Sequence, residues 1–308
     1  MKKKVVRVIA PGFKPNDFVL SNIEFFFSQH PEFDFLYDPH IIEKHPLNSA
    51  CLKTRAQSLV SALEDDRVDI IWCLRGGYGS IQLLPFLDQI DWDQVKTSKK
   101  KKLLMGLSDI TSLHIYFFQR WGWSSLHASH LDRWVEGKID KKTKKENLDL
   151  LFSKKHQVVF KKIKPINQLA KKCKVISAVL VGGNLVTLTS HLGTPYELDL
   201  DGKFLFFEEI GERAYRIDRC LTQLLHAGKF KNCRGIFIGQ MTQCLEPNGK
   251  SLLAWLWKEW GEKLGLPVFK GVQTGHDTIQ RPLPLGSRAK IKKRGDDFEL
   301  SVEYNFRS

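Results

Sequence analysis

The sequence predicts an α/β protein with two domains: an N-terminal, doubly wound, parallel α/β domain and a C-terminal mixed β/α domain of the swivelling type. Three observations lead to this prediction. Short apolar runs alternate with segments of helical periodicity over the first 130 residues. The run 68–74 is almost uninterruptedly apolar, as in strands that are buried on both faces of a parallel sheet. Residues 289–304 instead alternate around Arg-Gly-Asp, which is the pattern of a β-hairpin.

In the N-terminal part, strands and helices follow one another with short connections, which favours right-handed crossovers between parallel strands. Asn16 is placed to cap a helix, because asparagine is favoured at helix N-termini. Ala56, Leu59 and Leu63 recur at helical spacing. We therefore expect strands at 5–10, 68–74 and 102–107, and helices at 16–30, 54–66, 81–87 and 110–121.

The C-terminal part has more strand character. Gly228 follows an amphipathic run and is expected to end a helix. We expect strands at 175–181, 204–207 and 235–241, the hairpin at 289–304, and helices that end at 191 and 228 and that span 252–264. The expected domains are 1–137 and 175–308, joined by a lysine-rich linker at 138–174.

The positive charge is concentrated in that linker. The 308 residues carry a net charge of +14, and residues 138–174 alone hold thirteen lysines against three acids, a balance of +10. Such a stretch suits a nucleic acid or an anionic surface, or is a solvated connector. Nucleic-acid grooves mix arginine with exposed aromatics, and this stretch has no arginine and only Phe152 and Phe160. We expect the connector, and no nucleic-acid partner.

Several classes of protein are excluded. A hydrophobic content of 42% rules out disorder, and no run of about 18 apolar residues offers a membrane span. The basic start is followed by an apolar run that Arg7 interrupts and Pro11 stops, so we expect no signal peptide and a cytoplasmic protein. The six cysteines form no C-x-x-C pair, which favours reduced thiols and no metal site.

The segment 105–110, Met-Gly-Leu-Ser-Asp-Ile, places Ser108 between a predicted buried strand and a predicted helix. This is the setting of a nucleophile elbow, a sharp turn that exposes the serine oxygen near the first N–H groups of the helix. Ile110 stands where the usual G-x-S-x-G motif has its second glycine. The alternative is that Ser108 and Asp109 only cap the helix.

A glycine-rich loop, 75–80, follows the strand 68–74 and begins with Arg75. Its glycines allow the backbone to approach a ligand closely, and the alternative is a tight turn that needs glycine. Loops at the carboxyl ends of parallel strands meet in one crevice. This loop could therefore supply an oxyanion donor to a nucleophile at Ser108.

Two further residues complete a set. Glu208 ends the apolar strand 204–207, and either orients a histidine or pairs with Arg213 or Arg216. His276 lies in a loop before Pro-Leu-Pro-Leu-Gly. The alternative to a functional role is that it is only a solvated side chain. The order serine, glutamate, histidine on an α/β scaffold fits serine-type acyl transfer, although spacing alone does not select it from other pairings.

These motifs together resemble the LD-carboxypeptidase family of serine peptidases, which includes muramoyltetrapeptide carboxypeptidase and the microcin C immunity peptidases. The resemblance covers nearly the whole chain. It is carried by Arg-Gly-Gly-Tyr-Gly at 75–79, Gly-Leu-Ser-Asp-Ile-Thr at 106–111, Gly-Gly-Asn-Leu at 182–185, Gly-Thr-Pro at 193–195, Phe-Glu-Glu at 207–209, Arg-Ile-Asp-Arg at 216–219, Gly-His at 275–276 and Leu-Pro-Leu-Gly at 283–286.

The resemblance implies a role for each candidate. Ser108 matches the nucleophile, His276 the general base and Glu208 the carboxylate that orients it, while the N–H groups of Gly77 and Asp109 match the oxyanion hole. The implied reaction removes the terminal D-alanine from the L-centre of diaminopimelate or lysine in a murein tetrapeptide. It needs no metal or cofactor, and family members are commonly homodimers. From its charge, we expect Arg75 to contact the free carboxylate of such a substrate, with a structural ion pair as the alternative.

The chain also departs from the family. Leu107 precedes the serine, Val181 precedes Gly-Gly-Asn, and His-Ala-Ser-His stands at 127–130 where a His-Gly-Pro-Met-like stretch is common. These departures concern the choice of substrate more than the catalytic set. The alternatives are a microcin-C-type peptidase that cleaves peptidyl or aminoacyl nucleotides, and a non-catalytic protein whose basic stretch binds nucleic acid or an anionic envelope polymer.

Overall fold

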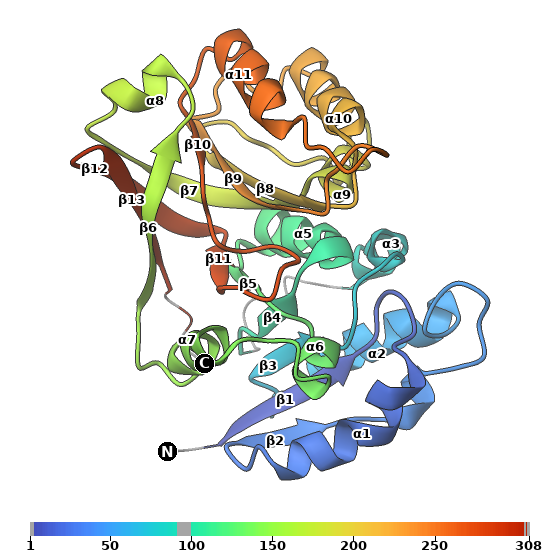
Figure 1. Cartoon of the computed structure of the whole chain (residues 1–308). Helices are drawn as coiled ribbons and strands as arrows, with labels where there is room; N and C mark the ends of the chain where they lie inside the picture. The colour runs from blue at the N-terminus through green and yellow to red at the C-terminus, as the bar shows by residue number, and fades with distance from the viewer. Residues whose placement is uncertain (1–2, 91–99, 305, 307–308) are drawn as a thin grey trace.

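The computed structural model describes residues 3–90, 100–304 and 306. These residues form a six-stranded sheet and, stacked above it in Figure 1, a closed barrel of seven strands. The predicted fold class is confirmed. In the described part of the chain, no helix has the length and apolar character needed to cross a membrane.

The six-stranded sheet has the order β11-β5-β4-β3-β1-β2. All neighbours in it are parallel except β11 and β5. Because β2 lies on one side of β1 and β3 to β5 lie on the other, the loops after β1 and β3 meet where the order reverses, the usual place for a ligand in such sheets. The strands are β1 (Lys4–Ile9), β2 (Phe33–Leu36), β3 (Ile70–Cys73), β4 (Leu103–Gly106), β5 (Ser125–His127) and β11 (Leu283–Leu285).

Helices cover both faces of this sheet. Alternate strand residues such as Val8 and Trp72 pack with α1 (Asp17–Ser28) and α6 (Leu131–Val135), alongside the short helix η1 (Pro39–Ile41). The strand residues that alternate with these pack against the helices on the opposite face of the sheet. That layer comprises α2 (Leu52–Glu64), η2 (Ser80–Leu83), α3 (Leu84–Leu87) and α5 (Thr111–Trp121). As predicted, Asn16 caps α1 by accepting the N–H of Val19.

The barrel closes in the order β10-β6-β13-β12-β7-β8-β9, with parallel pairing from β7 through β10 and antiparallel pairing elsewhere. Phenylalanines such as Phe206 and Phe269 fill its interior, and a second apolar core lies under α9, α10 and α11. The bounds are β6 (Gln157–Pro165), β7 (Val175–Asn184), α9 (Leu185–Thr189), β8 (Phe204–Ile210), α10 (Ala214–His226), β9 (Gly235–Thr242), α11 (Leu253–Lys263), β10 (Val268–Lys270), β12 (Ser287–Arg294) and β13 (Asp297–Glu303).

The segment 138–174 is more than a connector. It holds α7 (Lys141–Leu151), β6 and α8 (Gln168–Lys172), and β6 pairs with β10 and β13 in the barrel wall. The expected domain limits at 137 and 175 remain predictions.

The chain returns to the first sheet near its C-terminal end. After β10 it leaves the barrel, and β11 then pairs with β5, so that Leu283 lies opposite His127. The loop 271–282 therefore spans from the barrel to the six-stranded sheet (Figure 1). His276 lies in this loop, which brings it to the junction of the two parts.

Candidate active site

Ser108 lies in a sharp turn between β4 and α5. The strand ends at Gly106, the short helix η3 (Ser108–Ile110) follows, and Ser108 has a φ of 62°. A non-glycine residue in this left-handed region is strained, and such strain is typical of a nucleophile elbow. A Cβ on Gly106 would lie 2.8 Å from Ile110 Cγ1, so the tight turn needs glycine there. The structure thus gives Ser108 the geometry that the sequence predicts.

His130 supports this turn, and the sequence analysis assigned it no role. Its Nε2 lies 2.9 Å from the carbonyl oxygen of Leu107 and 3.2 Å from the Leu107 N–H, so either tautomer bonds the residue before Ser108. A Cβ on Gly76 would lie 2.7 Å from the His130 ring and 3.1 Å from Ser108 Cβ. Burial, and then the positive charge of His276, lower the pKa of His130 to about 3. His130 is therefore a neutral support for the turn.

The glycine-rich loop is fastened to the serine turn. The carboxylate of Asp109 accepts the N–H of Gly79 at 3.2 Å and that of Ser80 at 2.8 Å. Gly77 has a φ of 96°, and a Cβ there would lie 2.3 Å from the ring of Phe13, so only glycine fits. Within the described residues, no acceptor is recorded for the N–H groups of Gly77 and Asp109. Neither N–H group is therefore committed to an acceptor in this part of the chain.

Arg75, at the start of this loop, is half-buried. Its Nε lies 4.0 Å from the Asp132 carboxylate, the outer limit of an ion pair. Burial raises the pKa of Asp132 to about 6. Because the pair is long and the Arg75 side chain is 40% exposed, Arg75 keeps donors for another carboxylate.

Glu208 and His276 form a tight pair. Glu208 Oε2 lies 2.6 Å from His276 Nδ1, and the Glu208 side chain has no exposed surface. Burial opposes the charged imidazole, but the charge of Glu208 and its hydrogen bond outweigh burial and raise the pKa of His276. No partner within the described residues is recorded for His276 Nε2. The glutamate thus fixes one ring nitrogen and leaves the other available to accept a proton.

Two glycines make room for this pair. A Cβ on Gly239 would lie 3.0 Å from Glu208 Cβ, and one on Gly275 would lie 3.1 Å from Glu208 Oε2 and 2.9 Å from Gln240 Cβ. Gly275 also has a φ of 146°, which side chains rarely allow. The Gly-His sequence is therefore a packing requirement of the Glu208–His276 contact.

Glu209, the neighbour of Glu208, belongs to a separate network that the sequence analysis did not assign. Its carboxylate accepts hydrogen bonds from Asn184 Nδ2 at 2.8 Å and from the Val186 N–H at 3.0 Å. The backbone N–H of Asn184 in turn donates to Thr111 Oγ1 at 2.9 Å. Burial, and then the charge of Glu208, raise the pKa of Glu209 to about 7. This network joins α5, the helix that follows Ser108, to β7, the strand that pairs with the strand of Glu208.

The three candidates do not form a continuous hydrogen-bonded chain in this state. Among the described residues, no hydrogen bond joins Ser108 to His276. Both lie near His130, which bonds the serine turn and whose pKa responds to His276. In the same part of the chain, no three His, Cys, Asp or Glu side chains gather as ligands for a metal ion.

Comparison with known proteins identifies the family. Residues 6–128 match the LD-carboxypeptidase N-terminal domain and residues 177–291 match the LD-carboxypeptidase C-terminal domain. This chain belongs to the LD-carboxypeptidase family and is a carboxypeptidase. It is 32% identical over 239 residues to the probable murein peptide carboxypeptidase of Bacillus subtilis, covering 77% of this chain and 73% of that one.

Solved structures of similar proteins match nearly the whole chain. Muramoyltetrapeptide carboxypeptidase from Oxalobacter formigenes matches with a TM-score of 0.80 and 25% identity, covering 97% of this chain and 100% of that one. The MccF-like protein from Bacillus anthracis matches with a TM-score of 0.83 and 22% identity, covering 99% and 98%. The latter similarity shows the shared fold alone.

Proposed function

We propose that this LD-carboxypeptidase is a serine peptidase that removes the terminal D-alanine from murein tetrapeptides, in a cytoplasmic pathway of peptidoglycan recycling. The observation that carries the proposal is the 2.6 Å contact between Glu208 Oε2 and His276 Nδ1, which leaves Nε2 available as a base. Ser108, held in a strained turn, is the residue whose proton this base would take.

Acylation begins when the Ser108 oxygen attacks the scissile carbonyl and His276 Nε2 takes the serine proton. The Glu208 carboxylate stabilises the resulting imidazolium. The Ser108–His276 hydrogen bond forms in the substrate complex, because such bonds are often long in the free enzyme. The N–H groups of Gly77 and Asp109, both without a recorded acceptor among the described residues, bind the developing oxyanion.

The second half of the reaction releases the products. His276 returns its proton to the amine of D-alanine, which leaves, and the diaminopimelate or lysine carbonyl remains esterified to Ser108. A water molecule, deprotonated by His276, then attacks this ester and frees the serine. No step requires a metal or an organic cofactor.

Arg75 is the proposed contact for the free carboxylate that marks the end of the peptide. Its guanidinium begins the loop that carries Gly77 and is only loosely paired with Asp132. A charged contact two residues before Gly77 would favour a substrate whose scissile bond lies next to a free terminal carboxylate. The active form is proposed to be a homodimer, as is common in the family.

The substrate is tested with three purified peptides. These are a murein tetrapeptide with diaminopimelate and terminal D-alanine, the same peptide with terminal L-alanine, and an aminoacyl nucleotide. Mass spectrometry of the products should show release from the first peptide only. Cleavage of the nucleotide conjugate with no D-alanine release would overturn the proposal in favour of a microcin-C-type activity.

A further inference from the structure

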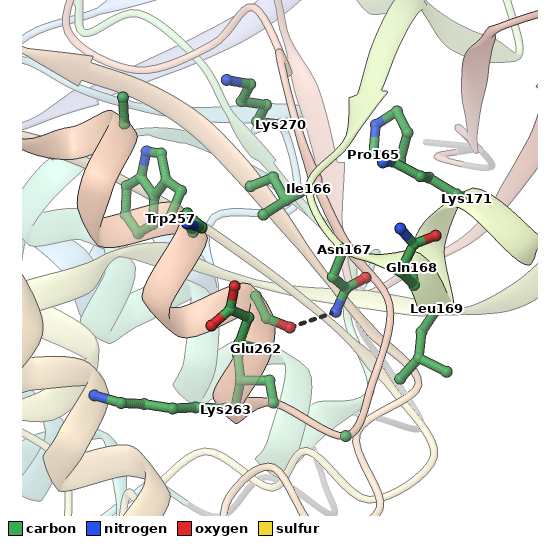
Figure 2. Close-up of a pocket in the computed structure, with 15 residues that line it drawn as sticks. Pro165, Ile166, Asn167, Gln168, Leu169, Lys171, Trp257, Glu262, Lys263 and Lys270 are labelled. Atoms are coloured by element: carbon green, nitrogen blue, oxygen red, sulfur yellow. Dashed lines mark hydrogen bonds between the residues drawn. The ribbon is translucent and has the colours of Figure 1, made fainter.

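Two large hollows in the described part of the chain lie outside the candidate active site. One, of about 780 Å³, lies between α8 and α11 (Figure 2). The Asn167 amide in it already donates to the carbonyl oxygens of Gly261 and Leu266. Both donors of the Asn167 side chain are therefore already used within the protein.

The other hollow, of about 1120 Å³, is strongly basic and lies between α7, β6 and the start of the His276 loop. We call it the basic pocket. Five lysines and an arginine line it, with Glu146 as the lining acid. The lining cations are Lys142, Lys154, Lys155, Lys161, Lys162 and Arg281.

Most of these cations lack a carboxylate partner. Arg281 pairs with Glu146 at 2.6 Å, and Lys155 pairs with Asp149 at 3.1 Å. Within the described residues, no ion pair is recorded for the other four lysines of the basic pocket. Like charges that share one hollow repel one another, and a bound anion relieves this repulsion.

The backbone of β6 is distorted where it enters the pocket. The pairing of β6 with β13 shifts register between Phe298 and Leu300, so that Lys161 and Lys162 form a bulge. Lys162 has a φ of 59°, which is unfavourable for a lysine. Bulges re-aim side chains, and strained residues gather at functional sites. This distortion places two adjacent lysines on the lining of one pocket.

The pocket also borders the loop that carries His276. Gly271 and Gln273 line it, and the Arg281 N–H donates to the Gln273 carbonyl at 3.1 Å, which closes the base of that loop. Arg281 is anchored further by the Val159 carbonyl and by the ring of Phe160. The pocket is thus a separate site on a rigid base, since none of its lining residues is a proposed participant in the reaction.

We propose that the basic pocket binds a small phosphate-bearing molecule with several negative charges. The four unpaired lysines supply the charge, and Leu150 and Val158 offer an apolar wall for the uncharged part of the ligand. The volume exceeds what a single phosphate ion needs, so a molecule of the size of a nucleoside diphosphate fits.

Binding is tested by titration calorimetry with inorganic tripolyphosphate, at fixed ionic strength. The variants are Lys161→Gln/Lys162→Gln, on β6, and Lys142→Gln/Lys154→Gln, on α7 and the turn that follows it. The control is Lys290→Gln/Lys292→Gln, which removes the same charge from exposed positions on the barrel strand β12. Exposed lysines tolerate such changes, and far-UV circular dichroism checks the fold of each protein.

The expected result is one tripolyphosphate per chain, with Kd weakened at least about tenfold in each pocket variant and unchanged in the control. Binding to Ser108→Ala should equal that of the wild type, so this test does not depend on the proposed reaction. If tripolyphosphate binding were weakened equally in the control, the binding would reflect net charge alone, and the proposed site would be overturned. Tight binding of a single-stranded oligonucleotide without tripolyphosphate binding would overturn it in favour of a nucleic-acid surface.

Discussion

Thr111 Oγ1 accepts the backbone N–H of Asn184 at 2.9 Å, and this contact connects the two parts of the candidate site. Thr111 begins the helix that follows Ser108, and Asn184 lies opposite Glu208 in the β7–β8 pairing. A Cβ on Gly183, the residue before Asn184, would lie 2.3 Å from Thr111 Oγ1. The position of Ser108 relative to Glu208 is therefore fixed by a close backbone approach.

Thr111→Val should destabilise the protein by about 1–3 kcal/mol, because the buried Asn184 N–H loses its acceptor while the side-chain shape is kept. Urea denaturation measures this change. Thr222→Val, at a half-buried position on α10, is the matched control and should stay within about 0.5 kcal/mol of the wild type. Equal stability of the two variants would show that the Thr111 contact contributes nothing.

Glu208→Gln should lower kcat/KM by roughly 10³-fold or more, because the imidazolium loses its carboxylate. The sign of the pH effect follows from the raised pKa of His276. A base acts in its neutral form, so wild-type activity falls as pH drops through that raised pKa. Without the negative charge the pKa of His276 falls, and the acid limb of the pH–rate profile moves to lower pH. An unmoved limb would argue against the pairing.

Gly275→Ala should reduce kcat at least about tenfold, because the new Cβ presses on Glu208 and Gln240 and displaces His276. Gly295→Ala is the matched control, since Gly295 has a φ of 65° but open space around its Cβ. It should lower stability by about 1 kcal/mol and leave kcat unchanged. Steady-state kinetics and thermal denaturation of both variants separate backbone strain from displacement of the histidine.

His130→Leu should reduce kcat about tenfold with little change in KM, because the Ser108 turn loses a hydrogen bond to Leu107. The acid limb should keep its position, since a group with a pKa of about 3 does not titrate in the working range. His130→Gln, which retains a donor, should recover part of the activity. A shifted acid limb in His130→Leu would instead mean that His130 takes part in proton transfer.

Local patterns predicted the elements around Ser108 well. The strand before Ser108, the helix after it and the capped helix at Asn16 each have a continuous pattern of their own. Short strands such as β5 and β11, each of three residues, carry too few positions for a period to appear. Their existence depends on pairing between distant segments, which no local pattern records.

The same reason limits prediction of the site. Ser108 and Glu208 were predicted because each follows a recognisable apolar strand, and His276 because it lies in a loop before Pro-Leu-Pro-Leu-Gly. The family resemblance joined the three into one set. The supporting roles of His130 and Thr111 were not predicted. They come from contacts with Leu107 and Asn184, respectively, which only the folded chain brings together. The lysines at 138–174 suggested a connector, since their pattern conceals the strand β6.

The most direct test of the proposed mechanism is D-alanine release from a diaminopimelate-containing murein tetrapeptide by the wild type and by Ser108→Ala, purified in parallel. The mechanism predicts release by the wild type and a loss of at least roughly 10³-fold in the variant, whose fold should be unchanged. Equal release by both proteins would contradict the assignment of Ser108 as the nucleophile.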